Sequence, residues 1–197
     1  FGIWNLDHGS PTLISLMLPT FIASQMVPTR LLGVHVYGSK FVESSELGYA
    51  LHITNGRTPL DFDLTEDKGL GARLYLAHEG DFGRLVLGSS GYIGTYVDQQ
   101  KKINAVGDNL FDWSDTVSYS EQVLGFDAAL DVADLRVRAE GVLRWVEYDG
   151  DKTEQIFTND GSVQYLSNRM EWASYLLVAY RTPWRLEPYL QGELSSK

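Results

Sequence analysis

Beyond residue 30, apolar and polar residues alternate along the chain in segments of mostly about ten residues. One such segment sets Leu47, Tyr49, Leu51 and Ile53 against neighbours that are small or polar. A period of two residues is typical of a β-strand with one apolar and one polar face, whereas an amphipathic helix would repeat near 3.6 residues. The pattern therefore predicts an all-β fold built from antiparallel strands.

The alternation divides residues 30–194 into eight predicted strands. They cover residues 32–37, 47–54, 70–77, 84–92, 124–131, 135–145, 171–181 and 185–194. Both faces of residues 171–181 are fairly apolar, and we place four side chains with the other apolar residues: Trp172, Leu176, Val178 and Tyr180. Residues 1–29 are interrupted by prolines, so we expect an irregular segment there, either a loop folded inside the sheet or a strand with rim structure.

The connections between the predicted strands are alternately short and long. Short ones fall at residues 38–45, 77–83, 132–134 and 182–184, and long ones at residues 55–68, 93–121 and 147–170. In an antiparallel up-and-down sheet this order puts every long loop at one end and every tight turn at the other. Bacterial outer-membrane barrels have this asymmetry, with short periplasmic turns and longer external loops.

The alternation of apolar and polar residues alone is compatible with two environments of such a sheet. In a soluble sandwich or barrel the apolar face is buried, whereas in a membrane barrel it meets lipid and the polar face lines the lumen. The membrane setting is favoured by small residues and arginines on the polar face, by strand length and by aromatic residues near strand ends. These aromatic residues are Tyr37, Tyr49, Tyr92, Trp145, Trp172 and Tyr180. We therefore expect an antiparallel up-and-down transmembrane β-barrel, with a soluble all-β binding module as the alternative.

Composition removes several other classes of protein. The chain has 26 acidic and 16 basic residues, a formal net charge of −10, so it lacks the cationic surplus that binding to nucleic acid requires. It has no cysteine, which excludes disulfides, thiol catalysis and thiolate metal sites. Its longest strongly apolar stretch, residues 13–23, is interrupted by polar residues and proline and falls well short of the roughly 20 residues of a membrane helix.

Several short motifs resemble one family of outer-membrane proteins. They are Phe1-Gly2-Ile3-Trp4-Asn5, Asp7-His8-Gly9-Ser10-Pro11, Pro28, a strand centred on Gly33, Leu47-Gly48-Tyr49-Ala50-Leu51, Thr54-Asn55-Gly56-Arg57, Lys68-Gly69-Leu70-Gly71-Ala72-Arg73-Leu74 and Leu186-Glu187-Pro188-Tyr189. Together they make nearly the whole chain resemble the porin-like barrels of the phosphate-selective porin O/P type in Gram-negative bacteria. The resemblance implies a bacterial outer-membrane location, contact with lipid and lipopolysaccharide, and a transport channel.

The same resemblance implies a larger barrel. A full-length member would have further strands upstream and a C-terminal strand that ends in an aromatic residue, and this sequence has neither. We therefore expect residues 1–197 to form a single barrel domain or a fragment of one. The glycine- and alanine-rich polar face favours an arc of about eight strands from a wide barrel. Phosphate selectivity does not carry over, because the chain has only six lysines, mostly in predicted loops.

The candidate functional residues are charged residues on the polar faces of the predicted strands. The predicted pore-lining set is Arg73, Arg136, Arg138, Arg144, Asp127, Asp131 and Glu140. Arginine suits a pore because it stays ionised and offers several donors to carboxylates and phosphates, and opposed charged walls orient polar solutes as they pass. The alternative is that these residues form mutually neutralising pairs that only solvate the interior.

The other candidate sites have weaker support from the sequence. A cluster of acidic residues at 61–67 suits Ca²⁺, but Glu66 stands where a calcium loop requires glycine, so we expect solvated loop residues there. His35 and His52 fall on the polar faces of neighbouring strands, and the hairpin register decides whether they meet. No nucleophile, base and orienting group occur together, so we assign no catalytic residue, no metal site and no cofactor.

The expected function is that of an outer-membrane porin, a passive diffusion channel for small hydrophilic solutes, with anionic solutes left open. It would select solutes by lumen width and local charge. Two other functions stay open: a structural outer-membrane barrel that sheathes or anchors a partner protein, and the soluble all-β binding module. Whether the protein forms a homo-oligomer is open as well.

Overall fold

The described part of the chain forms one large antiparallel β-sheet and two small hairpins. The structure is a computed structural model, and it describes residues 26, 33–55, 68–97, 100–103, 111–114, 118–148, 154–157, 163–166 and 168–196. The large sheet contains β1 (Gly33–Val42), β2 (Ser45–Thr54), β3 (Gly69–Gly80), β4 (Gly83–Val97), β7 (Ser118–Val132), β8 (Leu135–Tyr148), β11 (Arg169–Tyr180) and β12 (Tyr189–Ser196). The hairpins are β5 (Gln100–Ile103) with β6 (Phe111–Ser114), and β9 (Glu154–Phe157) with β10 (Val163–Leu166).

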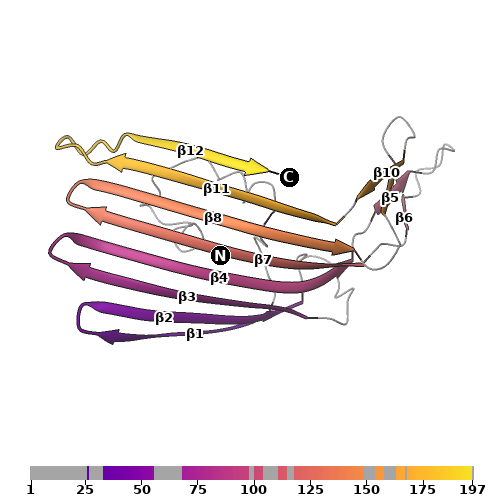
Figure 1. Ribbon diagram of the computed structural model, residues 1–197, viewed down its shortest axis with the longest axis horizontal. Coiled ribbons are helices and arrows are strands. Elements are labelled where there is room, and N and C mark those ends of the chain that lie inside the picture. Colours follow the sequence, from indigo (N-terminus) through magenta and orange to yellow (C-terminus); the bar gives the residue numbers. More distant parts are fainter. Residues whose placement is uncertain are drawn as a thin grey trace.

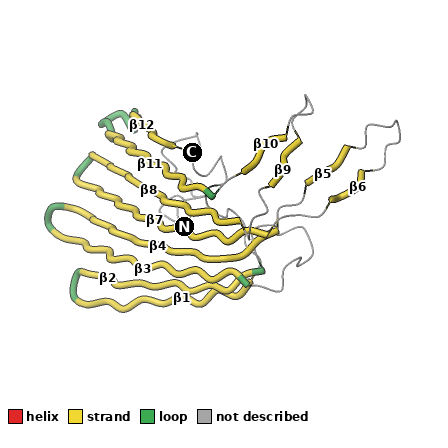
Figure 2. The backbone as a smooth tube through the Cα atoms, turned by 45° about the vertical axis from the view of Figure 1, so that its right-hand side comes forward, coloured by secondary structure: helices red, strands yellow, loops and turns green. Residues whose placement is uncertain are grey.

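The eight strands of the large sheet follow one another in chain order. Each pairs antiparallel with the next, which is the up-and-down topology that the alternation predicts. Tight turns at residues 43–44, 81–82 and 133–134 lie at one end of the sheet, and both small hairpins lie at the opposite end (Figures 1 and 2). The all-β fold and its alternation of short and long connections are therefore confirmed.

Several strands are longer than the sequence pattern predicts, and the difference is largest for β4 and β7. β4 and β7 have 15 residues each, and they extend into residues 93–121, which the pattern assigns to a long connection. Both strands continue to pair with each other along this extension, up to Val97 opposite Ser118. The charged and aromatic residues of the extension therefore belong to the sheet.

The predicted strand at residues 185–194 begins too early, because β12 starts only at Tyr189. The preceding residues form a wide turn in which the Thr182 hydroxyl donates to the carbonyl of Leu186 and accepts from its amide, at 2.8 and 3.1 Å. Pro183 and Pro188 flank this turn and have no backbone N–H to donate to a neighbouring strand. Regular pairing therefore resumes only after the second proline.

The large sheet is open within the described residues. β1 and β12 are its two edges, and no pairing joins them in the described part of the chain. A strand at the edge of a sheet presents a row of backbone donors and acceptors that another strand can use. What the structure establishes is thus an eight-stranded up-and-down sheet rather than a closed barrel.

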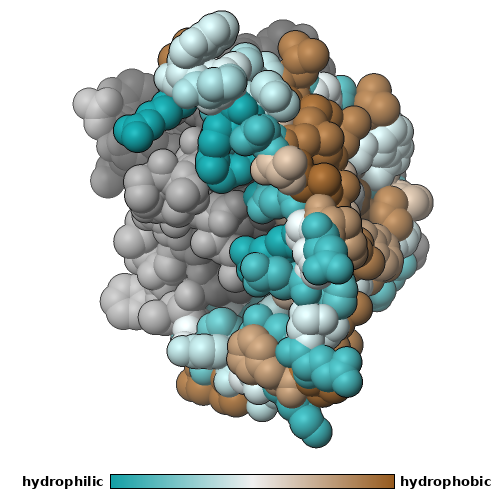
Figure 3. Space-filling view, turned by 90° about the vertical axis from the view of Figure 1, so that its left-hand side faces the viewer, coloured by the Kyte–Doolittle hydropathy of each residue, from teal (hydrophilic) through white to brown (hydrophobic). Residues whose placement is uncertain are grey.

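The two faces of the sheet differ in chemistry and in exposure. We call the face of Leu51, Leu74 and Phe126 the apolar face, and the face of Arg73 and Asp127 the charged face. The three apolar side chains are 53, 61 and 54% exposed, whereas the side chains of Arg73 and Asp127 are 10 and 1% exposed. Seen from the tight-turn end, hydrophobic residues gather on one side of the sheet and hydrophilic residues on the other (Figure 3). This is the inverse of a soluble sandwich, in which the apolar face is the buried one.

The main cluster of buried apolar residues lies on the charged face. They are Tyr92, Tyr96, Tyr119, Val123, Val142, Val146, Ala173, Tyr175, Leu177 and Ala179, together with Met26. Met26 is the one described residue of the segment 1–29, and it is 1% exposed. The rest of that segment lies outside the described residues, so the choice between an inward loop and a rim structure stays a prediction.

Candidate functional site

All seven residues of the predicted pore-lining set lie on the charged face. They are Arg73 on β3, Asp127 and Asp131 on β7, and Arg136, Arg138, Glu140 and Arg144 on β8. Side chains two residues apart on a strand point to the same face of the sheet. Residues that pair directly on neighbouring strands, such as Asp127 and Glu140, also share a face. The structure therefore brings the set together on one surface, and its role in a pore stays a prediction.

Two arginines of the charged face each bind a carboxylate through both terminal nitrogens. Arg73 reaches from β3 to β7, where Nη1 donates to Oδ1 of Asp127 and Nη2 donates to Oδ2 at 2.8 Å. Arg138 donates from the same two atoms to Asp131, at 2.6 and 3.0 Å. Bidentate guanidinium–carboxylate pairs fix the relative orientation of the two groups as well as the distance between them. These charges neutralise each other in pairs, as the alternative interpretation of the sequence holds.

A larger charge network lies toward the end of the long connections. Arg144 donates from Nε to Glu121 at 2.9 Å and from Nη1 to Glu171 at 2.8 Å. Arg169 donates from Nε to the other oxygen of Glu171 at 2.9 Å. The side chains of Arg144, Glu121 and Glu171 are 10, 0 and 5% exposed. A guanidinium between buried carboxylates offsets their repulsion and part of their desolvation.

Sequence reasoning missed most of this network. Glu121 and Arg169 fall within stretches that the pattern assigns to long connections, residues 93–121 and 147–170. A signal for Glu121 was present, because it lies an even number of residues before Asp127 and so shares its face if the strand continues. The extension of β7 to Ser118 shows that the strand does continue.

Two further members of the predicted set also have side-chain partners. The Tyr175 hydroxyl on β11 donates to Glu140 at 3.0 Å. Arg136 donates to Glu187 at 3.2 Å, and these two side chains are 21 and 25% exposed. Glu187 belongs to the wide turn between β11 and β12. The partners come from strands and turns far away in sequence, so spacing along the chain does not reveal them.

A row of aromatic rings crosses the charged face. Neighbouring ring centroids are 5.4 to 6.3 Å apart in the order Tyr37, His35, His52, Tyr92, Tyr96, Tyr119 and Tyr148. Such separations are typical of stacked and tilted aromatic pairs. His35 and His52 are direct cross-strand partners, which settles the register that the sequence leaves open. Tyr37 and Tyr92 lie on the charged face, and Tyr92 is 2% exposed, so the predicted place of these two at a lipid interface is wrong.

Glycines on the charged face make room for side chains from neighbouring strands. A Cβ added at Gly48 would lie 2.1 Å from the ring of Tyr75, and one at Gly71 would lie 1.7 Å from Nε2 of His52. At Gly88 it would lie 2.4 Å from Asp127, whose pair with Arg73 crosses β4 there. Glycine permits this close approach because it has no side chain. Neighbouring side chains therefore occupy the space beside these three glycines, and the arc of a wide barrel stays a prediction.

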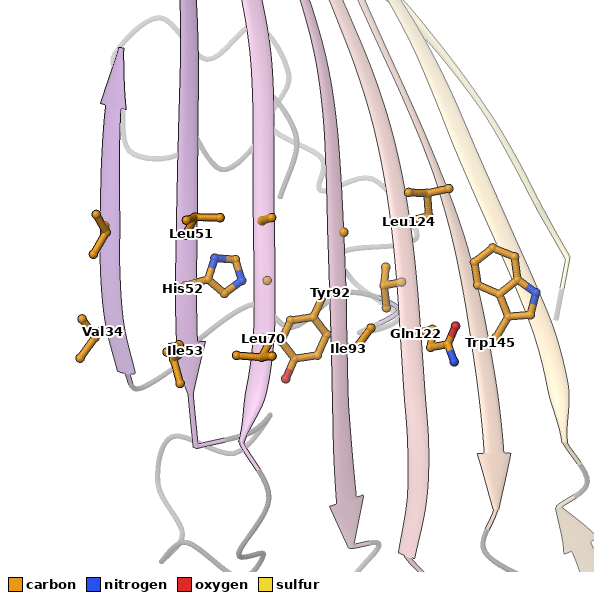
Figure 4. A pocket seen from close by; sticks show the side chains of 15 residues that line it. Val34, Leu51, His52, Ile53, Leu70, Tyr92, Ile93, Gln122, Leu124 and Trp145 are labelled. Carbon is orange, nitrogen blue, oxygen red and sulfur yellow. The ribbon is translucent and has the colours of Figure 1, made fainter.

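The apolar face carries a hollow of about 820 Å³ (Figure 4). The large side chains around it include Leu51, Ile53, Leu70, Ile93, Leu124 and Trp145. It forms where Ala72 and Gly91 pair directly, because neither residue fills the space between these side chains. Catalytic and cofactor sites need convergent polar groups, and this mainly apolar lining does not supply them.

Other predicted sites gain no support from the described residues. The described residues contain no group of three or more histidine, aspartate or glutamate side chains that could hold a metal ion. The acidic cluster at residues 61–67 lies outside the described residues, as does His8. In the part of the chain that the structure describes, no helix has the length and apolar character needed to cross a bilayer.

Comparison with known proteins gives no relative. No family model matches the chain, no curated protein matches it and no solved structure matches it. The resemblance to the phosphate-selective porin O/P type therefore stays an expectation based on short motifs. The function has to be inferred from the chemistry of the sheet.

Proposed function

We propose that this protein is a β-barrel of the bacterial outer membrane that acts as a porin, a passive diffusion channel for small hydrophilic solutes. One observation carries the proposal: the sheet exposes its apolar face and, on the strands between its edges, buries much of its charged face. Membrane barrels have this arrangement because their outer surface meets hydrocarbon and their inner surface is polar.

The distribution of charge supports a lipid-facing apolar surface. On the eight strands of the large sheet, fourteen charged residues lie on the charged face: Glu46, Arg73, Glu79, Arg84, Glu121, Asp127, Asp131, Arg136, Arg138, Glu140, Arg144, Arg169, Glu171 and Glu193. Only Lys40 and Glu147 lie on the apolar face, both near a strand end. A charge near a strand end reaches the headgroup region, where it is tolerated far better than at the bilayer centre.

A bilayer also accounts for two features that would be liabilities in water. Soluble proteins rarely expose contiguous apolar patches beyond a few hundred Å², and exposed sheet edges invite aggregation. In a membrane the apolar face is solvated by lipid. The edges β1 and β12 then have to pair, with each other or with strands outside the described residues, because hydrocarbon cannot satisfy their backbone groups.

In this proposal the charged face lines a water-filled lumen. Solutes move down their own concentration gradient, so transport requires no energy source. Selection comes from the width of the lumen and from the field of the fixed charges, which the ion pairs hold in defined orientations. The aromatic row and the filled glycine sites narrow the interior on the side where they lie.

Conductance across a planar lipid bilayer tests the proposal. The purified protein, added from detergent, should produce stepwise increases in current that are stable over time. Detergent alone and heat-denatured protein are the controls and should produce none. A protein that stays monodisperse without detergent and gives no current would be a soluble all-β module, and the porin proposal would then be abandoned.

A structural barrel that sheathes or anchors a partner is the second candidate. It is favoured by the burial of the charged face, where Met26 packs into the tyrosine-rich cluster and the charges are largely paired. Such a barrel would insert into lipid vesicles and protect its strands from protease, yet would carry no current. The combination of insertion without conductance would favour it over a porin.

A further inference from the structure

We infer that the channel prefers cations to anions, an inference that rests on the proposed channel function. It names the solute class as small hydrophilic cations and places the selection on the charged face. The inference comes from the balance of fixed charges on that face and from the partners that its arginines already have.

The charged face carries more acidic than basic residues. Eight of its fourteen charged residues are aspartate or glutamate and six are arginine, which leaves a formal net charge of −2. A channel wall of one net sign raises the local concentration of the opposite ion, and low-dielectric surroundings strengthen the effect. Acidic walls are the usual arrangement in cation channels.

Three of the six arginines of the charged face, Arg73, Arg138 and Arg144, offer little binding capacity to a passing anion. Arg73 and Arg138 each use both terminal nitrogens on a carboxylate. Arg144 lies between two carboxylates and is bound to both. An anion would have to displace these internal partners before it could use the guanidinium donors, and the carboxylates of Asp127, Glu121 and Glu171 would then be left buried without that cation.

Two carboxylates of the same face accept hydrogen bonds from phenols. Tyr75 donates to Glu46 at 2.8 Å, and Tyr175 donates to Glu140 at 3.0 Å. A phenol fixes the orientation of a carboxylate but adds no positive charge to it. Both carboxylates are among the eight acidic residues of the charged face.

The long connections and residues 1–32 do not reverse this balance of charge. Residues 55–68, 98–117 and 149–168, which connect strands at one end of the sheet, contain twelve acidic residues against five lysines and arginines. Residues 1–32 contain one charge of each sign, Asp7 and Arg30. The surplus at the end of the long connections thus has the same sign as the charged face, which favours entry of cations.

The reversal potential in a KCl gradient tests the inference on the intact protein in a planar bilayer. We expect K⁺ to be more permeant than Cl⁻ by a factor on the order of two to ten, as a surface potential of about half to one kT would produce by enriching K⁺ and depleting Cl⁻ together. The double variant Glu46→Gln with Glu140→Gln should lower this ratio, because it removes the net negative charge of the charged face. Glutamine keeps an oxygen that accepts the phenol hydrogen bond, so the local geometry is retained.

Two further variants make the test independent of that double substitution. Arg136→Gln removes a partly exposed positive charge, 21% exposed, from the same face and should raise the K⁺ over Cl⁻ ratio. Glu147→Gln is the matched control, because it removes a carboxylate from the apolar face and should leave the ratio unchanged.

The outcomes separate the inference from the proposed function. A protein that gives no current overturns the channel proposal itself. A current that prefers Cl⁻ overturns the cation inference and leaves the channel standing. The same holds if K⁺ is preferred but neither the double variant nor Arg136→Gln changes the ratio, because the charged face would then not set the selectivity.

Discussion

Arg144 holds two buried carboxylates, Glu121 and Glu171, together on the charged face. The variant Arg144→Met keeps much of the volume of the side chain but removes its charge. We expect the free energy of unfolding to fall by about 3 to 5 kcal/mol, because both carboxylates then lose a cation while they stay buried. Urea titration followed by tryptophan fluorescence measures this loss.

Arg136→Met is the matched control for that change. Its pair with Glu187 is partly exposed, at 21 and 25%, so the loss should be about 1 kcal/mol or less. Equal losses in the two variants would mean that Arg144 does not hold a buried network together.

The sequence predicts the face of the sheet on which a residue lies far better than it predicts the side chain with which that residue pairs. The predicted lining set shares one face because parity along a strand needs only local information. Partners depend on register and on side-chain reach across strands. Arg73, for example, passes over β4 to Asp127 only because Gly88 has no side chain in the way.

At the scale of elements, the turn between β7 and β8 places Ala133 at a φ of 49°. A side chain in this left-handed region costs roughly 1 kcal/mol or more. Ala133→Gly should therefore raise the free energy of unfolding by about 0.5 to 1 kcal/mol, since the relief of strain exceeds the added freedom of the unfolded chain. Urea titration provides the measurement.

The same substitution four residues earlier serves as the control. Ala129 lies inside β7 and is 8% exposed, so Ala129→Gly should lower stability by about 1 kcal/mol. If both substitutions lowered stability alike, the left-handed turn at Ala133 would be contradicted.

The strands that the sequence predicts are those in which apolar and polar residues alternate over many positions. The eight strands of the large sheet follow from segments long enough to show a period of two residues. The hairpins β5–β6 and β9–β10 have only four residues in each strand, which is too short to reveal a period. The start of β12 was misplaced because alternation continues through the prolines that interrupt pairing.

At the scale of the whole molecule, periodicity could not decide which face is buried. A strand that alternates apolar and polar residues has the same pattern in a soluble sandwich and in a membrane barrel. Closure of the sheet leaves no mark in the alternation either. The exposure of Leu51, Leu74 and Phe126 is information that only the assembled sheet supplies.

Substitutions at two leucines of nearly equal exposure can distinguish an apolar face that contacts lipid from one that contacts water. Leu74 lies in the middle of β3 on the apolar face and is 61% exposed, whereas Leu186 lies in the turn between β11 and β12 and is 63% exposed. In water, exchange of either leucine for arginine would change stability little, because the charge would be solvated at both positions. In a bilayer, Leu74→Arg should cost about 2 to 4 kcal/mol and Leu186→Arg only about 0 to 1 kcal/mol. Urea titration of the protein folded into lipid vesicles measures both values, and equally small changes would place the apolar face in water.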